Sequence, residues 1–317
     1  MTPPEHGARW VERRFPAMGS QTHLVLWGTD ADADWAMAEV ARLEQRWSRF
    51  LPGSDVTRVN RAAGGPVAVA PETATLVATA CTWWERTDGW FDPTVLDALV
   101  AHGYDVPFRE VRARPVTRPV VESAPTGRRP IRIPAVGRPL PGRPTPGCAG
   151  VTVDPAAGTI RLPPGVHLDL GGIGKGATAD LVIGGLHERG VASACLSMGG
   201  DIRVTGAAGW PVPVEDPLDE DRTWFTHLVT DGAIVTTTDR FRRWEHGGRT
   251  QHHLIDPTTG RPAETGLAAV VVAHAECATA EVLAKAAFVA GRAVGAALVA
   301  RHGGEAWFRD ATGAPLP

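Results

Sequence analysis

Apolar residues recur along this chain with two periods, one typical of helices and one typical of strands. Between residues 30 and 47 they follow the helical period of 3.6, with charged residues at the positions between them. Residues 71–87 show the same spacing, and residues 278–290 are apolar almost throughout. The pattern therefore predicts two amphipathic helices and one buried helix.

Alternating or continuous apolar residues predict strands in much of the remaining chain. The first is expected within residues 9–28, around Leu24 and Leu26. The others are expected at 151–162 as a hairpin, at 191–206 as two strands about a Gly-Gly turn, and at 210–214, 224–238, 267–275 and 305–310. These strands come in consecutive pairs as often as they alternate with helices. They therefore predict an α+β protein with mostly antiparallel sheets rather than a doubly wound parallel sheet.

Two loops are predicted between these elements. Residues 48–65 are polar and rich in turn-forming residues, and Asn60 within them is interpreted, on these residues alone, as a turn residue. Residues 88–95 contain two aromatic side chains that favour burial, which predicts an ordered loop rather than a linker. Asp92 is expected to cap the helix that follows, with Pro93 at its first position.

The stretch 167–181, HLDLGGIGKGATADL, has the features of a phosphate-binding turn. Its first residues alternate in polarity and predict a short half-buried strand, which breaks at three glycines before a helix begins at Lys175. Such a turn gathers unpaired backbone N–H groups, the positive end of a helix dipole and an amine. The glycine spacing matches neither a Walker loop nor a dinucleotide fingerprint. On these residues alone, a phosphate site and a tight connection with a solvated lysine are equally good interpretations.

Composition and charge narrow the class of protein. The 317 residues are 43% hydrophobic and 21% charged, which is typical of a globular protein with a sizeable core. A net charge of -3 argues against nucleic acid or an anionic membrane as the main partner. The N-terminus has no apolar segment long enough for a signal peptide or a membrane helix, so a cytoplasmic protein is expected. The four cysteines include no C-x-x-C pair, which predicts ordinary thiols rather than a zinc site or disulfides.

Residues 107–147 differ in character from the rest of the chain. Proline and arginine dominate, with nine arginines against two glutamates, and the apolar period is lost. An irregular surface excursion is the preferred interpretation, because the interleaved aromatic residues of a nucleic-acid-binding arm are missing.

Five short motifs occur in one order along the chain: FPAMGS at 15–20, WFDPTV at 90–95, LDLGGIGKG at 168–176, SMGGDI at 197–202 and HLIDPTTG at 253–260. Together they resemble the ApbE family, the FAD:protein FMN transferases, over residues 15–291. The resemblance implies a single domain over residues 1–317, built of two αβ lobes with FAD in the cleft between them. It further implies an enzyme that uses Mg²⁺ to cleave the FAD pyrophosphate, releases AMP and attaches FMN to a threonine or serine of an acceptor flavoprotein.

The resemblance assigns most of the site to the glycine-rich motifs. Lys175 and the backbone of Gly172 and Gly174 are implied to lie at the FAD diphosphate and the metal, with the Gly172 carbonyl as a metal ligand. The turn formed by Gly199, Gly200 and Asp201 is implied to approach the nucleotide, with Asp201 as a hydrogen-bond acceptor and catalytic group. The remaining implied flavin and nucleotide contacts are Met18, Asn60, Asp92, Tyr104, Thr237, Thr238 and Asp256, the last of which also secures its own turn.

By the same resemblance, His253 is the candidate proton acceptor for the incoming threonine hydroxyl. It directly precedes the I-D-P-x-T-G turn of the family, and a histidine titrates near neutral pH, which suits a base. Without that motif, a buried histidine bonded to the backbone would be the simpler interpretation. His252 is expected to point to the opposite face of the same strand.

The metal site departs from the family pattern. The family places an aspartate and, four residues later, a second oxygen ligand on one face of its last long helix. Here these positions hold Glu281 and Lys285, and an ammonium cannot coordinate a cation. One interpretation is an ordinary helix ion pair. The other is that the Lys285 amine occupies part of the cation's place and offsets phosphate charge, so that Mg²⁺ affinity falls. The sequence Thr-Thr-Thr-Asp at 236–239 likewise replaces a Thr-Ser-Gly turn.

Three functions stay open on the sequence. The leading one is FMN transfer to an acceptor protein. FAD hydrolysis to FMN and AMP, with water in place of the acceptor, is the nearest alternative. A protein that binds FAD with little or no turnover, because Lys285 alters the metal site, is the alternative of a different class. The sequence identifies neither the acceptor protein nor the oligomeric state.

Overall fold

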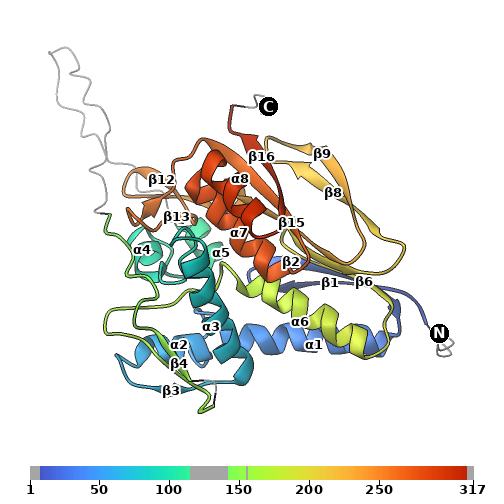
Figure 1. Ribbon diagram of the computed structural model, residues 1–317, viewed down its shortest axis with the longest axis horizontal. Coiled ribbons are helices and arrows are strands. Elements are labelled where there is room, and N and C mark those ends of the chain that lie inside the picture. Colours follow the sequence, from blue (N-terminus) through green and yellow to red (C-terminus); the bar gives the residue numbers. More distant parts are fainter. Residues whose placement is uncertain (1–7, 115–141, 155, 313–317) are drawn as a thin grey trace.

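A seven-stranded antiparallel sheet forms the centre of the protein (Figure 1). The computed structural model describes residues 8–114, 142–154 and 156–312. The strand order is β1-β2-β6-β7-β10-β15-β16, and each neighbouring pair is antiparallel. The strands are β1 (Arg9–Ala17), β2 (Ser20–Gly28), β6 (Ser193–Met198), β7 (Asp201–Thr205), β10 (Gly232–Thr238), β15 (Leu267–His274) and β16 (Glu305–Asp310).

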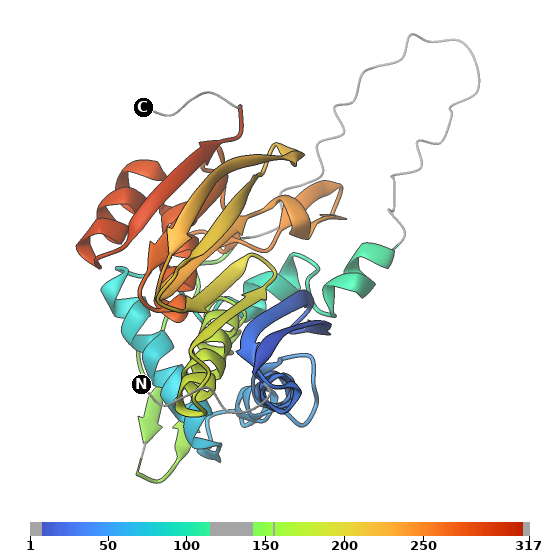
Figure 2. The ribbon, with the colours of Figure 1, turned by 90° about the vertical axis from the view of Figure 1, so that its right-hand side faces the viewer.

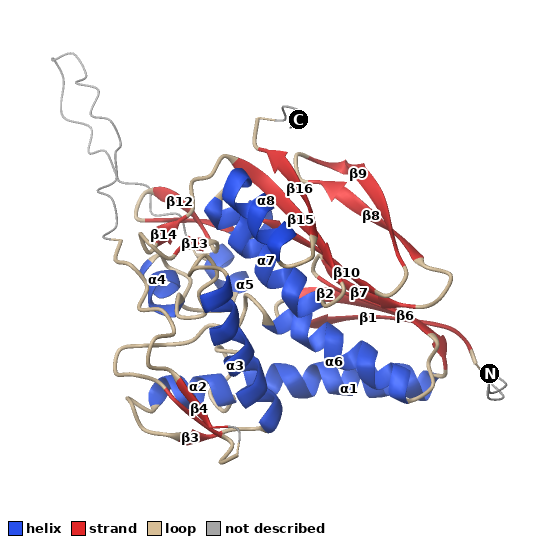
Figure 3. Ribbon diagram, in the orientation of Figure 1, coloured by secondary structure: helices blue, strands red, loops and turns tan. Residues whose placement is uncertain are grey.

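Helices cover one face of this sheet, as Figure 3 shows. Those in contact with its strands are α1 (Asp30–Trp47), α6 (Gly174–Glu188), α7 (Cys277–Ala290) and α8 (Arg292–Arg301). On β15, Val270 and Val272 lie in the core under the helices, whereas Val271 lies in a second core with the strands β8 (Trp210–Asp216) and β9 (Asp219–Val229). Because β15 is buried on both faces, its sequence is a continuous apolar run.

Smaller elements surround this layered core (Figure 2). The helices are α2 (Asp55–Arg61), α3 (Pro71–Arg86), α4 (Leu96–Ala101), α5 (Phe108–Ala113) and the 3-10 turn η1 (Arg240–Arg242). Three small antiparallel sheets pair β3 (Val67–Ala68) and β4 (Thr152–Asp154) with β5 (Thr159–Arg161), β11 (Arg243–His246) with β12 (Arg249–His252), and β13 (Ile255–Asp256) with β14 (Arg261–Pro262). Among the described residues, no helix is both long enough and apolar enough to cross a membrane.

Helix α1 begins and ends where the sequence predicts. The Thr29 hydroxyl oxygen accepts the N–H of Asp32, and the Asp32 carboxylate accepts the N–H of Thr29, which forms a capping box. Its apolar stripe, including Val40 and Leu43, is fully buried. The cap and the stripe together explain why this segment is helical.

Glycine lets α6 and α7 meet closely at their first turns. A Cβ on Gly176 would lie 2.5 Å from the carbonyl oxygen of Cys277, so a larger residue would displace backbone. Asp180, further along α6, accepts the N–H groups of Cys277 and Ala278 at 2.9 and 2.8 Å and so caps α7. The start of α6, with Lys175, is thereby fixed against α7.

The structure confirms the α+β class with mostly antiparallel sheets. The predicted loop over 48–65 is wrong in part, because it contains α2, whose first turn is capped by Ser54. The predicted strand at the start of 167–181 is also wrong. Leu168 and Asp169 alternate in burial as expected, but their N–H groups bond to the Asn60 side chain and the Pro93 carbonyl instead of a neighbouring strand. The division into two lobes stays a prediction.

Further boundaries differ from the predictions for local reasons. Helix α4 begins at Leu96 rather than at Pro93, because Asp92 accepts the N–H and the hydroxyl of Thr94 and stabilises a turn there. Residues 9–28 form a two-stranded hairpin, and residues 224–238 are divided between β9 and β10. Helix α8 is an element that the sequence patterns do not predict.

The described ends of the segment 107–147 pack against the protein. Its first residues form α5, with Val111 buried, so the prediction of irregular structure is wrong there. At the other end, the Thr145 N–H donates to the carbonyl of Pro257 at 2.8 Å. Residues 115–141 lie outside the described residues.

Candidate functional site

A cavity of about 860 Å³ lies beside the glycine-rich bend that precedes α6. This volume is typical of sites for small organic ligands. Its walls include the β1–β2 turn, residues around α4 and α5, and the residues that follow β12. Of the predicted site residues, those that line it are Met18, Asp92, Tyr104, Gly172, Gly174, Lys175, His253 and Lys285. A smaller hollow of about 460 Å³ over α3 is lined by none of the predicted residues.

Side chains from other segments bind the glycine-rich bend and fix its position. Asn60 bridges the backbone of Leu168, donating to its carbonyl at 2.8 Å and accepting its N–H at 2.7 Å. Asn60 does not line the cavity, so the structure places it behind the bend. Asp169 forms a buried ion pair with Arg49, with Nε and Oδ2 2.8 Å apart. Both side chains therefore position the bend.

Backbone N–H groups at this bend are available to an anion. Gly174 opens α6, and its N–H bonds to the Leu170 carbonyl at 2.8 Å. Within the described residues, the N–H groups of Gly172 and Lys175 have no protein partner. Because the first turn of a helix carries partial positive charge, this end of the cavity favours a phosphate group.

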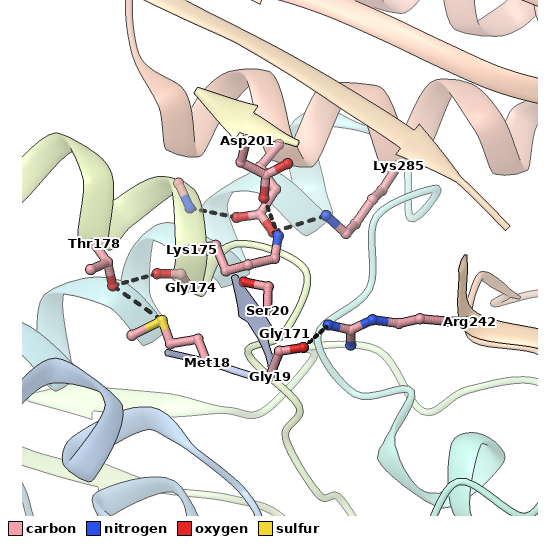
Figure 4. A network of polar contacts seen from close by, with 12 residues as sticks. Met18, Gly19, Ser20, Gly171, Gly174, Lys175, Thr178, Asp201, Arg242 and Lys285 are labelled. Atoms are coloured by element: carbon pink, nitrogen blue, oxygen red, sulfur yellow. Dashed lines mark hydrogen bonds and ion pairs between the residues drawn. The ribbon is translucent and has the colours of Figure 1, made fainter. Parts of the chain in front are cut away.

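Two amines and two carboxylates meet directly at this end (Figure 4). Glu281 of α7 is completely buried, and its Oε1 accepts from Lys175 Nζ at 2.8 Å and from Lys285 Nζ at 2.9 Å. Its Oε2 accepts the N–H of Gly176 at 2.8 Å. Lys175 also contacts Asp201, which is 3% exposed. We call these four side chains, Lys175, Asp201, Glu281 and Lys285, the lysine–carboxylate cluster.

Mutual attraction decides the charge states in this cluster. Burial disfavours the charged form of Glu281, but the Lys175 and Lys285 ammonium groups outweigh it and lower the pKa of that carboxyl to about 2. Burial likewise opposes the Lys175 ammonium, yet Asp201 and Glu281 raise the pKa of Lys175 above its usual value. Burial raises the pKa of Asp201 to about 6, against the attraction of Lys175. Glu281 is therefore the fixed anion, and Asp201 the carboxyl that titrates nearer neutral pH.

The residues of the lysine–carboxylate cluster do not fit a divalent cation. Mg²⁺ requires oxygen ligands in near-octahedral geometry. Both oxygens of Glu281 already accept from amines or an amide, and Lys285 offers an ammonium, which cannot coordinate a cation. In the described part of the chain, no three His, Cys, Asp or Glu side chains are grouped to hold a metal. The cluster is instead internally neutral.

His253 lies at the same end of the cavity as a neutral imidazole. Burial and the nearby cations, Arg242 first among them, lower the pKa of His253 well below its usual value. Its Nδ1 is buried, with no hydrogen-bond partner among the described residues. The neighbouring His252 is committed to structure, because its Nε2 lies 3.1 Å from the Ala263 carbonyl and its Nδ1 accepts the N–H of Leu254. His253 is therefore a neutral imidazole with an unbonded nitrogen, but its lowered pKa makes it a weaker base than the near-neutral histidine expected from the sequence.

Another part of the cavity wall is aromatic. Tyr104 packs against Phe50 and Phe108, with ring centroids 5.9 and 6.1 Å apart. The guanidinium of Arg49 lies over the Tyr104 ring, 4.7 Å from its centroid, and Arg242 donates to the Tyr104 hydroxyl at 3.0 Å. Planar rings edged by cations suit a planar aromatic ligand.

The β1–β2 turn forms another wall of the cavity. Met18 adopts a left-handed conformation with φ of 49°, which is uncommon for a residue other than glycine. Its sulfur lies 3.5 Å from the hydroxyl oxygen of Thr178 in α6, which is also 2.8 Å from the Gly174 carbonyl. This contact fixes the turn beside the start of α6, as Figure 4 shows. A strained residue at a cavity wall is consistent with a role in ligand binding.

The other predicted residues lie behind the cavity wall. Gly199 and Gly200 form the tight β6–β7 turn, both with positive φ, and the Gly200 carbonyl accepts the Thr236 N–H at 3.1 Å. This turn places Asp201 against Lys175. Thr237, Thr238 and Asp256 do not line the cavity, and Asp256 secures its own turn by accepting from Thr258 and Thr259. Their roles toward a nucleotide stay predictions.

Several cavity residues escape sequence reasoning. Arg49 and Arg242 come from separate polar segments, and Phe50 and Phe108 from segments interpreted as loops. Nothing in their local sequence distinguishes them from surface residues. A weak signal was available for Phe108, because it is the only aromatic residue in the proline- and arginine-rich stretch 107–147.

Comparison with known proteins agrees with this geometry. The model of the ApbE family matches residues 18–308. An FAD:protein FMN transferase from Vibrio cholerae is 28% identical over 93% of this chain and 85% of that protein. One from Rhodobacter capsulatus is 28% identical over 89% of this chain and 51% of its own length, so this chain spans about half of that protein. The crystal structure of the ApbE protein from Thermotoga maritima matches with a TM-score of 0.78 at 26% identity, covering 96% of both chains.

Proposed function

Because the chain belongs to the ApbE family, we propose that it transfers the FMN part of FAD to a threonine or serine hydroxyl of an acceptor flavoprotein and releases AMP. One observation carries this proposal. A single cavity is lined by the glycine bend, Lys175 and His253 and also by a group of aromatic and cationic side chains. FAD, with its central diphosphate and planar rings, has the matching chemistry.

The diphosphate is placed at the start of α6. The N–H groups of Gly172 and Lys175 and the Lys175 ammonium supply donors to its oxygens. One of the two ring systems of FAD then packs against Tyr104 and Phe108. Arg242, which is bonded to the Tyr104 hydroxyl, adds positive charge between the two regions.

The reaction is a substitution at the phosphorus of the FMN half. The acceptor hydroxyl oxygen forms a bond to this phosphorus, and the bond from phosphorus to the bridging oxygen breaks, so that AMP leaves with that oxygen. His253 accepts the hydroxyl proton, since its imidazole is neutral and its Nδ1 or Nε2 has a free lone pair. Lys175 and the bend N–H groups offset the charge that develops on the leaving AMP. No step here depends on Mg²⁺, which the residues of the lysine–carboxylate cluster do not fit.

Two alternatives use the same cavity. If water reaches the phosphorus instead of the acceptor hydroxyl, the products are FMN and AMP. If the lysine–carboxylate cluster holds FAD without turnover, no AMP forms. The substitution of an amine for an oxygen ligand at Lys285 is the observation that favours this second alternative.

The test incubates the purified protein with FAD and an acceptor protein of the Vibrio cholerae transferase. We expect AMP and a covalently flavinylated acceptor in equal amounts, and no labelling when the target threonine is replaced by alanine. His253→Asn should lower transfer by about 10²–10⁴-fold, the usual contribution of a general base, while FAD still binds. His187→Asn, on the exposed end of α6, is the matched control. AMP without labelled acceptor would indicate hydrolysis, and bound intact FAD without AMP would indicate a binding protein.

A further inference from the structure

The chain contains only two lysines, and both belong to the lysine–carboxylate cluster. Thirty of its 32 lysine and arginine residues are arginines. The two exceptions, Lys175 and Lys285, lie 110 residues apart in sequence, yet both donate to Glu281 Oε1, at 2.8 and 2.9 Å. An ammonium is a compact charge whose three N–H donors can be shared among several oxygens, whereas a guanidinium is a flat fork. Two such compact amines can share the single Oε1 atom of Glu281, as Lys175 and Lys285 do here.

The Lys285 side chain is built into the wall of the cavity. A Cβ on Gly172 would lie 2.9 Å from the Phe91 ring, which is too close, and 3.5 Å from Lys285 Cδ, which is an ordinary contact, so the lysine stem runs directly alongside the glycine bend. The Lys285 side chain is 16% exposed and lines the cavity, as does Lys175 at 15%. Figure 4 shows the two amines approaching from different helices. Both can therefore reach a ligand without leaving Glu281.

The charge count of the cluster opposes a divalent cation. Two ammonium groups balance two carboxylates, and Glu281 has no oxygen that is not already accepting. A divalent cation would have to expel at least one ammonium and then lie beside the other. A diphosphate requires neither change, because it adds acceptor oxygens next to amines that still have N–H donors to give.

We propose that the Lys285 ammonium takes the place of a bound divalent cation, so that this protein holds the FAD diphosphate through two lysines without metal. This inference rests on the proposed function, since it presumes that FAD is the ligand. Lys285 is a binding residue in this account, because it touches the substrate phosphate. The departure of Lys285 from the family pattern is then an exchange of one cation for another rather than the loss of a site.

Equilibrium binding of FAD, followed by flavin fluorescence, tests this directly. The affinity should agree within about twofold between EDTA and millimolar Mg²⁺, because a cation that does not bind with FAD has no coupling to it. Mg²⁺-dependent binding would overturn the inference and leave the proposed function standing. Absence of FAD binding under both conditions would instead contradict the proposed function.

Variants at position 285 distinguish the effect of the Lys285 charge on FAD binding from a structural effect of the substitution. Lys285→Met should weaken FAD binding by about tenfold or more, with or without Mg²⁺. Lys285→Asp should bind FAD as weakly as Lys285→Met in EDTA but regain affinity in Mg²⁺, because its carboxylate can coordinate the cation. Arg249→Met removes an exposed cation outside the cavity and should leave the affinity unchanged. Equal FAD affinity in the wild type and Lys285→Met would overturn the inference.

A measurement on the unaltered chain covers the case in which these variants fail to fold. Protein labelled with ¹⁵N at lysine side chains has only two ammonium signals to assign. Addition of FAD in EDTA should shift both, because both amines gain phosphate contacts. A shift of the Lys175 signal alone would contradict the role of Lys285.

Discussion

Removal of the Lys175 ammonium is expected to destabilise the protein strongly, because it leaves two buried carboxylates with one cation. Asp201 is 3% exposed and Glu281 is completely buried, so water cannot replace the lost partner. Lys175→Met keeps most of the side-chain stem and removes the charge. Removing one member of a buried ion pair costs about 3–5 kcal/mol.

This cost converts to a measurable shift in melting temperature. The unfolding entropy of a chain of this size is about 0.7 kcal/mol/K, so a loss of 3–5 kcal/mol lowers Tm by about 5–8 °C. Calorimetry and urea unfolding followed by tryptophan fluorescence both measure the change. The double variant Lys175→Met/Glu281→Gln should be more stable than the sum of the single losses predicts, because it removes the stranded charge as well.

The pH dependence of the stability loss in Lys175→Met gives a second, independent test. Without Lys175, the pKa of Asp201, which burial already raises in the folded protein, rises further, and the pKa of Glu281 loses the largest attraction that lowers it. A carboxyl whose folded pKa is raised destabilises the protein increasingly as pH rises through that pKa. The deficit of Lys175→Met should therefore be larger at pH 8 than at pH 5. A loss below about 1 kcal/mol, or a deficit that grows in acid, would refute the buried-cluster reasoning.

Two further predictions follow from the geometry. Gly176→Ala should lower the free energy of unfolding by about 1–3 kcal/mol, because its Cβ would lie 2.5 Å from the Cys277 carbonyl oxygen. Gly184→Ala on the same helix meets nothing within 4 Å and should raise the free energy of unfolding by up to about 1 kcal/mol. Similar urea midpoints for the two variants would contradict this prediction. The His253 ring signals should not titrate between pH 6 and 8 in an NMR experiment, and Arg242→Gln should move their midpoint upward toward the ordinary value near 6.5. A midpoint near 6.5 in the wild type would be the contrary result.

Local sequence was sufficient to predict an element when the residues that determine its structure all lie within that element. Helix α1 has a capping residue, an apolar stripe and polar flanks within one segment, and it is found where predicted. The apolar run of β15 required only that both faces of the sheet be covered. The prediction of a strand at the start of 167–181 was wrong, because alternating polarity indicates which side chains are buried but not whether the backbone pairs with another strand. Its N–H groups bond to Asn60 and Pro93, which are remote in sequence.

The candidate site could be predicted only as separate motifs. The glycines and Lys175 were recognisable together because they share one segment. The local sequence did not show that Lys175 and Lys285 both bind Glu281, because this arrangement depends on the close crossing of α6 and α7 that Gly176 permits. Of the aromatic part of the cavity wall, the resemblance implied Tyr104, whereas Phe50 and Phe108 were missed for the same reason. Phe50 and Tyr104 are more than 50 residues apart and meet only in the folded protein.

The central claim is that backbone amides and Lys175 at the glycine bend hold the diphosphate of a flavin nucleotide. Fluorescence titrations of FAD and of riboflavin, which lacks phosphate, test it most directly in the wild type and in Lys175→Met. The account predicts that the wild type prefers FAD and that the variant loses at least about tenfold of this preference, equivalent to about 1.4 kcal/mol. An unchanged ratio of the two affinities in Lys175→Met, or no FAD binding by the wild type, would contradict it.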